Sequence, residues 1–115
     1  MKYQNNVTWN DKWIVEEVFK GKKGGYFVEA GAVTGIGGSS CYVLEKELEW
    51  TGIAIEARES IIPGLRHNRP NSIAVNACLW YKEGDEVDFV EYEHGEGACG
   101  LSGIINQDCS MTRPD

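Results

Sequence analysis

The sequence predicts an α/β fold with a mainly parallel sheet, flanking helices and a C-terminal antiparallel strand. Three short apolar segments alternate with segments of helical periodicity. The first apolar segment ends in Glu29 and runs into a glycine-rich turn, and the second ends in Glu56. Alternating strands and helices imply right-handed crossovers and parallel strands, which is the arrangement of a doubly wound domain.

The chain has 115 residues, enough for one domain. A complete doubly wound enzyme is usually about twice as long, because it contains two halves of about 100 residues each. The last residues, 110–115, show no helical or strand pattern. We therefore expect a truncated, partial domain over residues 26–115, with a helix and loop over residues 1–25 packing on it.

The charge and the apolar content narrow the classes of partner. A formal net charge of -7 disfavours binding to a phosphate backbone, which requires clustered Lys and Arg. No apolar run approaches the roughly 20 residues of a membrane span, and the N-terminus lacks the apolar core of a signal peptide. The four cysteines contain no C-x-x-C motif, so no metal site is predicted. We expect a cytoplasmic protein that binds neither nucleic acid nor a membrane.

The first half of the chain is predicted to form a helix, a strand, a second helix and a second strand. Asn10 is the expected N-cap of the first helix, and the loop 21–25 ends that helix. Ser39 or Ser40 is the expected cap of the second helix. In chain order, these four elements cover residues 10–19, 26–30, 40–48 and 53–55.

The second half of the chain continues the alternation of helices and strands and then departs from it. A helix is expected over 58–68, with Pro63 in its first turn, followed by a third strand over 72–80. After a tight turn at 82–85, the segment 86–92 is predicted to return antiparallel along the third strand.

The glycine turn and the two acids together indicate a cofactor site. Side chains at Gly31 and Gly35 would keep a ligand away from the backbone. The following helix is expected to begin with free N–H groups, which favour an anionic group. Glu56, at the end of the second strand, is expected to accept hydrogen bonds from ribose hydroxyls.

The nature of the cofactor depends on Glu29. The turn 31–37 also fits the G-x-x-x-G-x-G pattern of short-chain dehydrogenases, but a Y-x-x-x-K match at 42–46 lies too early in the chain for those enzymes. An acid two residues before the first glycine is typical of S-adenosylmethionine-dependent methyltransferases, where it can engage the ammonium group of the cofactor. A dinucleotide would place its pyrophosphate near Glu29, which would repel it.

Several stretches resemble the FkbM-type methyltransferases. They span roughly residues 11 to 104, and the matching runs are 27–35, 42–57, 68–70, 75–77 and 101–104. The chain departs from the family pattern in having Glu29 where Asp is usual and Val33-Thr34 where Asn-Asp or similar residues stand. It also lacks a later strand of the type K-I-D-V-E-G.

The resemblance implies a Rossmann-like methyltransferase fold, S-adenosylmethionine as methyl donor, and a hydroxyl of a sugar or another small molecule as acceptor. It places the methionine part of the cofactor among residues of the first turn, the ribose at Glu56, and the adenine near Ala57 and the end of the third strand. The residues assigned to the cofactor are Glu29, Gly31, Ala32, Gly35, Glu56, Ala57, Asn76 and Ala77. No catalytic residue is assigned, although His94 and Glu96 lie in a glycine-rich loop.

Two other functions remain open on the sequence. One is a fragment of an NAD(P)-dependent short-chain reductase, which the glycine turn also fits. The other is a non-catalytic α/β module that forms homo-oligomers through open sheet edges.

Overall fold

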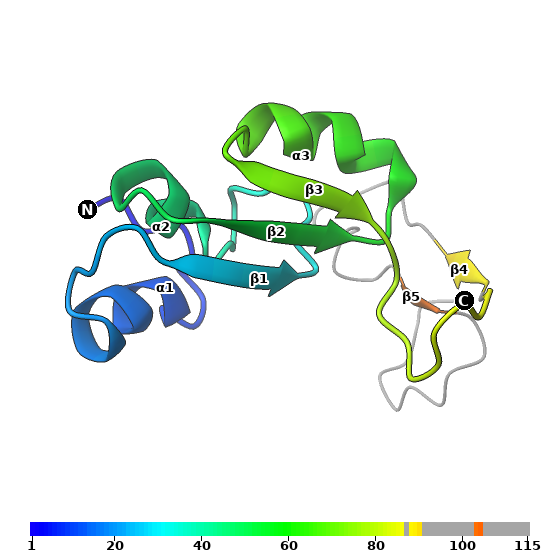
Figure 1. The fold of residues 1–115 in the computed structure, drawn as a ribbon, viewed down its shortest axis with the longest axis horizontal. Coiled ribbons are helices and arrows are strands. Elements are labelled where there is room, and N and C mark those ends of the chain that lie inside the picture. The colour runs from blue at the N-terminus through cyan, green and yellow to red at the C-terminus, as the bar shows by residue number, and fades with distance from the viewer. Residues whose placement is uncertain (87, 91–102, 105–115) are drawn as a thin grey trace. The chain divides into compact units, whose positions relative to one another are not determined.

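The computed structural model describes residues 1–86, 88–90 and 103–104. The chain divides into two compact units, Met1–Leu79 and Trp80–Asp115. The first unit contains a three-stranded sheet and all of the helices in the described residues, and the second contains a two-stranded sheet (Figure 1).

The sheet of the first unit is parallel, as the sequence predicts. Its strands are β1 (Tyr26–Ala30), β2 (Thr51–Glu56) and β3 (Ser72–Asn76), in the order β1-β2-β3. The register places Glu29 beside Ala54, and Glu56 beside Asn76. The bounds predicted for β1 are confirmed, whereas β3 ends at Asn76 instead of continuing to Trp80. The first unit is therefore a βαβαβ arrangement.

The helices fall where the periodicity predicts them, with shorter bounds. In chain order they are α1 (Asn10–Trp13), the π-helix η1 (Ile14–Val18), α2 (Tyr42–Glu47), the 3₁₀ turn η2 (Glu59–Ile61) and α3 (Ile62–Asn68). The N-cap prediction for the first helix is wrong: Trp9 occupies that position with φ of 56°, and no side chain caps the helix. Pro63 does lie in the first turn of α3.

The hydrophobic core lies on one face of the sheet. Its larger cluster joins η1, β1 and α2 and consists of Val15, Phe27, Cys41, Val43, Leu44, Leu48 and Trp50. A second cluster joins the loop after β1, β2 and α3 and consists of Ala32, Ala54, Ile62 and Leu65. Helices α2 and α3 therefore pack on the same side, as two successive right-handed crossovers require.

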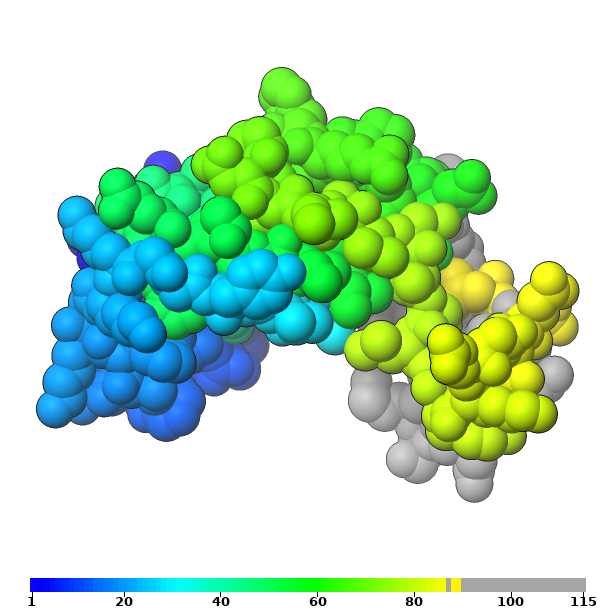
Figure 2. All heavy atoms as spheres, viewed as in Figure 1, coloured from blue at the N-terminus to red at the C-terminus, as the bar shows by residue number. Residues whose placement is uncertain are grey.

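The opposite face of the sheet is apolar and exposed. Side chains alternate across a strand, so Tyr26 and Val28 of β1 and Ile73 of β3 point away from the core. Their exposed fractions are 61%, 64% and 64%. Figure 2, viewed from the same side as Figure 1, shows the strands at the surface. Purely parallel sheets are usually covered on both faces, so this face is unusual.

The second unit corrects the prediction for the segment 86–92. Strand β4 (Phe89–Val90) is antiparallel, but it pairs with β5 (Gly103–Ile104) and not with the third strand. The loop with His94 and Glu96, the match at 101–102, and Cys99 and Cys109 lie outside the described residues. Within the described residues, no helix has the length and apolar character needed to cross a membrane.

Candidate cofactor site

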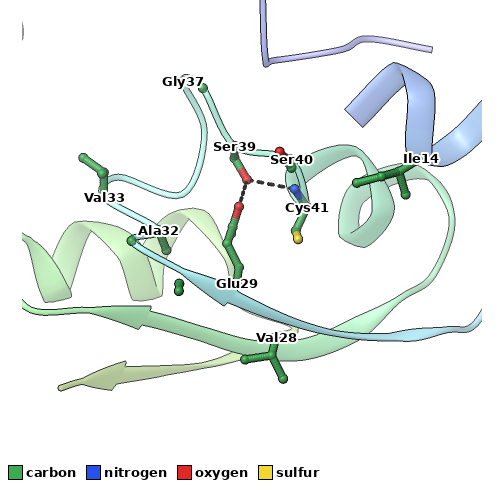
Figure 3. Close-up of a pocket in the computed structure, with 12 residues that line it drawn as sticks. Ile14, Val28, Glu29, Ala32, Val33, Gly37, Ser39, Ser40 and Cys41 are labelled. Carbon is green, nitrogen blue, oxygen red and sulfur yellow. Dashed lines mark hydrogen bonds between the residues drawn. The ribbon is translucent and has the colours of Figure 1, made fainter. Parts of the chain in front are cut away.

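A cavity of about 500 Å³ lies beside the carboxyl end of β1 (Figure 3). Its walls come from the end of β1, the loop that follows, and Ile14 of η1. Crevices at the carboxyl ends of parallel strands are where open α/β sheets bind ligands. Four of the lining residues belong to the turn 31–37 that the sequence singles out: Gly31, Ala32, Val33 and Gly37. Glu29 and Ala30, which end β1, also line the cavity. The distal wall is formed by residues 37–41.

Glu29 is the charged group on the cavity wall. Its side chain points away from Val28, toward the loop (Figure 3). Only 9% of Glu29 is exposed. One carboxylate oxygen accepts a hydrogen bond from Ser39 Oγ at 2.6 Å, and the other accepts one from Arg69 Nη1 at 2.8 Å. Because each oxygen can accept a second hydrogen bond, these partners fix the carboxylate without exhausting it.

Arg69 links Glu29 on the cavity wall to Glu45 of helix α2. It is fully buried, and its Nε donates to Glu45 Oε1 of α2 at 2.8 Å. Its Nη1 also donates to the carbonyl of Gly35 at 3.1 Å, and the guanidinium lies 5.2 Å from the centre of the Phe27 ring. Burial alone would lower the pKa of Arg69, but its hydrogen bonds to Glu45 and Glu29 outweigh this and raise that pKa. Arg69 therefore stays charged.

The cluster around Arg69 contains two buried carboxylates and one guanidinium. Glu45 is 3% exposed and also accepts hydrogen bonds from the backbone of Asn71 and from Ser72 Oγ. Glu29, Glu45 and Arg69 thus carry one negative charge in excess when both carboxylates are ionised. Charge that is buried without a partner is unfavourable, so a positively charged ligand group in the cavity would be stabilised.

The second helix begins differently from the prediction. Cys41, and not Ser39 or Ser40, occupies the N-cap position of α2, and no side chain caps the helix. Ser39 Oγ nevertheless accepts hydrogen bonds from the backbone of Cys41 and Tyr42 at 3.1 Å each, so the first N–H of α2 already has a partner. Since α2 has only six residues, its dipole adds little. A carboxylate beside this helix start points to a cationic ligand group more than to an anionic one.

The glycines of the turn serve the backbone and the core. Gly31 has φ of 72°, in the left-handed region that glycine adopts without strain, and its N–H donates to the carbonyl of Ile55 at 2.8 Å. Ala32 is buried against β2 and α3. At Gly35, a Cβ atom would lie 2.6 Å from Arg69 Cγ and 2.8 Å from Leu65 Cδ1. The absence of a side chain at Gly35 therefore makes room for Arg69, and Gly35 does not line the cavity.

Glu56 lies one strand away and holds the same loop. It is 5% exposed, and its two oxygens accept hydrogen bonds from the backbone of Val33 at 2.9 Å and of Arg58 at 2.8 Å. Each of these oxygens has a second lone pair that can accept another hydrogen bond. Glu56 thus fixes the turn after β1 and retains the capacity to accept a hydroxyl group.

The remaining predicted residues cluster at the ends of β2 and β3. Asn76 donates through its amide to the carbonyls of Glu56 at 3.1 Å and of Ala57 at 3.0 Å. The backbone of Ala77 donates to the same Glu56 carbonyl at 3.3 Å. Asn76 also lines a separate hollow of about 330 Å³ against η2 and α3. The structure therefore brings the predicted residues into two groups. Glu29, Gly31 and Ala32 line the cavity, whereas Glu56, Ala57, Asn76 and Ala77 meet at the ends of β2 and β3, and Glu56 lines neither hollow.

The sequence did not indicate that Arg69 and Glu45 belong to the site, and it singled out Ser39 only as a possible helix cap. Arg69 lies in the Asn68-Arg69-Pro70 stretch, but nothing in that stretch alone shows that its side chain is buried. Cys41 is buried, whereas Cys78 is only partly so. Burial raises the pKa of the Cys41 thiol to about 12, and Glu29 adds to this rise, so Cys41 is not a nucleophile here.

Val33 adopts a strained conformation at the rim of the cavity. Its φ is 53°, and a β-branched residue rarely adopts this region. Its side chain points outward from the loop (Figure 3), while its N–H is held by Glu56. Asn tolerates the left-handed region better because its short polar side chain can form local hydrogen bonds.

We expect Val33→Asn to stabilise the protein by about 1 kcal/mol, since left-handed backbone costs other residues about 1–2 kcal/mol. Urea unfolding followed by circular dichroism measures this difference. Val33→Thr is the control, because Thr is polar yet keeps the β-branch. Equal stabilities of the Asn and Thr variants would show that strain at this position is negligible.

No family model, curated protein or solved structure matches this chain. The described residues also contain no group of three or more His, Cys, Asp or Glu side chains that could hold a metal ion. The geometry of the cavity is therefore the basis for a functional assignment.

Proposed function

We propose that this chain is the cofactor-binding part of an S-adenosylmethionine-dependent methyltransferase of the FkbM type. The observation that carries the proposal is the Glu29 carboxylate on the cavity wall, within a buried cluster of two carboxylates and one guanidinium. That cluster has one excess negative charge when both carboxylates are ionised. S-adenosylmethionine carries an ammonium and a sulfonium group, either of which would compensate that charge. The ammonium group would also donate hydrogen bonds to the acceptor positions that remain on the Glu29 oxygens.

The second group of predicted residues suits the nucleoside part of the same cofactor. Glu56 retains acceptor capacity for ribose hydroxyls, and Ala57, Asn76 and Ala77 surround the neighbouring strand ends. Gly31 and Ala32 line the cavity beside Glu29, and the N–H of Val33, which also lines it, donates to Glu56. A methyl donor held in this way would serve a hydroxyl of a sugar or small molecule, which is the acceptor class we propose.

The reductase alternative fits the site less well. A nicotinamide dinucleotide would bring a pyrophosphate to the turn after β1, where Glu29 carries negative charge. The N–H groups of Cys41 and Tyr42 at the start of α2, which would otherwise be available to that pyrophosphate, already donate to Ser39.

Thermal unfolding with either ligand distinguishes the two cofactors. S-adenosylhomocysteine at ten times its dissociation constant should stabilise the native state by about 1.4 kcal/mol and raise the melting temperature. NADH at the same concentration should leave the melting temperature unchanged. A rise with NADH alone would replace the methyltransferase proposal with the reductase.

One observation favours a second candidate function, a module that self-associates. Tyr26, Val28 and Ile73 expose an uncharged apolar surface on the helix-free face of the sheet. Exposed patches of this kind often mark interaction sites. The face, and not only the open edges predicted from the sequence, would then bind a second copy.

We expect concentration-dependent dimerisation of the wild type in sedimentation experiments, and its loss in Ile73→Lys. A buried lysine charge at the interface would be unfavourable, which explains the loss. Val7→Lys is the matched control, because Val7 is 83% exposed and lies outside the sheet. A wild type that stays monomeric at all concentrations, with S-adenosylhomocysteine bound, would leave only the methyltransferase proposal.

A further inference from the structure

The N-terminal segment lies against the distal wall of the cavity. We call residues 2–5 the N-terminal strap. The N–H of Gly38 donates to the carbonyl of Gln4 at 3.1 Å, and Asn5 Nδ2 donates to Ser40 Oγ at 3.3 Å. Gly38 and Ser40 both line the cavity. The strap is therefore attached to the outside of the segment that closes the proposed cofactor site.

Asp11 anchors the strap to α1. Its side chain is fully buried, and its Oδ2 accepts hydrogen bonds from the backbone of Gln4 at 2.7 Å and of Asn5 at 3.0 Å. The N–H of Lys2 donates to Glu47 at 2.9 Å, which ties the other end of the strap to α2. A buried carboxylate needs such partners, so Asp11 and the strap fix each other.

The wall that the strap holds is intrinsically flexible. Gly37 and Gly38 lie side by side in it, and Gly38 has φ of 76°. Glycine loses more conformational freedom on ordering than any other residue. Without the strap, a ligand would have to order this wall when it binds. The free-energy cost of that ordering would lower the affinity for the ligand.

We propose that Asn5 and Asp11 are positioning residues, which pre-organise residues 37–40 for the cofactor without touching it. This inference rests on the proposed function for its ligand, but its structural part can be measured without one. Loss of the hydrogen bond from Asn5 to Ser40 should weaken S-adenosylhomocysteine binding by about threefold to tenfold, the range expected for one lost hydrogen bond.

The test compares Asn5→Ala with Asn6→Ala in the full chain. Asn5 is buried and bonded to the wall, whereas its neighbour Asn6 is exposed. Amide hydrogen exchange at Gly38, measured by NMR without ligand, reports whether the wall is held. The amides of β2 report global unfolding in the same spectrum. Calorimetry with S-adenosylhomocysteine gives the affinity of each variant.

We expect faster exchange at Gly38 and weaker binding in Asn5→Ala, with unchanged β2 amides, and neither effect in Asn6→Ala. Asp11→Asn, which removes the charge and one acceptor oxygen that hold the strap, should act in the same direction, and it replaces Asn5→Ala in the test if that variant fails to fold. Unchanged exchange at Gly38, or faster exchange with unchanged affinity, would overturn the inference. If the wild type binds no S-adenosylhomocysteine, the proposed function fails, and Gly38 exchange alone decides whether the strap holds the wall.

Discussion

Arg69→Met should lower the free energy of unfolding by about 3–5 kcal/mol, because it leaves the buried carboxylates of Glu29 and Glu45 without their shared partner. Domains of this size are stable by only about 5–15 kcal/mol, so the variant should be close to unfolding. Met has a similar length and no charge, which keeps the loss of packing small. Urea unfolding followed by circular dichroism measures the effect.

Arg66→Met is the matched control for this variant. Arg66 is exposed on α3, three residues before Arg69, so its loss should change stability by no more than about 0.5 kcal/mol. Adding Glu29→Gln and Glu45→Gln to Arg69→Met should restore part of the stability, since the uncompensated charges are then removed. If Arg69→Met alone unfolds within 1 kcal/mol of the wild type, the buried cluster does not stabilise the fold as described.

Glu56→Ala should weaken S-adenosylhomocysteine binding by about 10- to 150-fold, the range for losing a hydrogen bond to a charged group of about 1.5–3 kcal/mol. The carboxylate would contact the ribose, and it also holds Val33 and Arg58 in place through their backbone N–H groups. Titration calorimetry with each variant measures the change.

Glu83→Ala is the control for Glu56→Ala, because Glu83 is exposed and belongs to the other compact unit of the chain. It should bind with wild-type affinity. Circular dichroism of Glu56→Ala separates loss of the site from loss of the fold. Wild-type affinity in a folded Glu56→Ala would remove Glu56 from the site.

The strands were predictable because their signals are local. Tyr26–Ala30 begins with an apolar run and lies between a glycine-rich loop and a glycine turn, which the sequence shows directly. That Tyr26 and Val28 are exposed while Glu29 is buried was not predictable from that run. The end of β3 was not predictable from an apolar run that continues to Trp80. In the structure, β3 stops at Asn76, whose amide bonds to the carbonyls of Glu56 and Ala57 on the neighbouring strand.

The candidate site was predictable only in part. Glu29, Gly31 and Ala32 follow from the acid and the glycine turn and do line one cavity. Arg69 could not be found in this way, because its partners Glu29 and Glu45 lie 40 and 24 residues away in the sequence. The same contacts changed the role expected of Gly35, which makes room for Arg69.

The most direct test of the central claim is calorimetric titration of S-adenosylhomocysteine into the wild-type chain and into Glu29→Gln. Because Glu29 supplies the negative charge on the cavity wall, the wild type should bind one ligand weakly, and the variant should bind it at least tenfold more weakly. Absence of any binding heat with millimolar ligand, in a wild type that is folded by circular dichroism, would contradict the account.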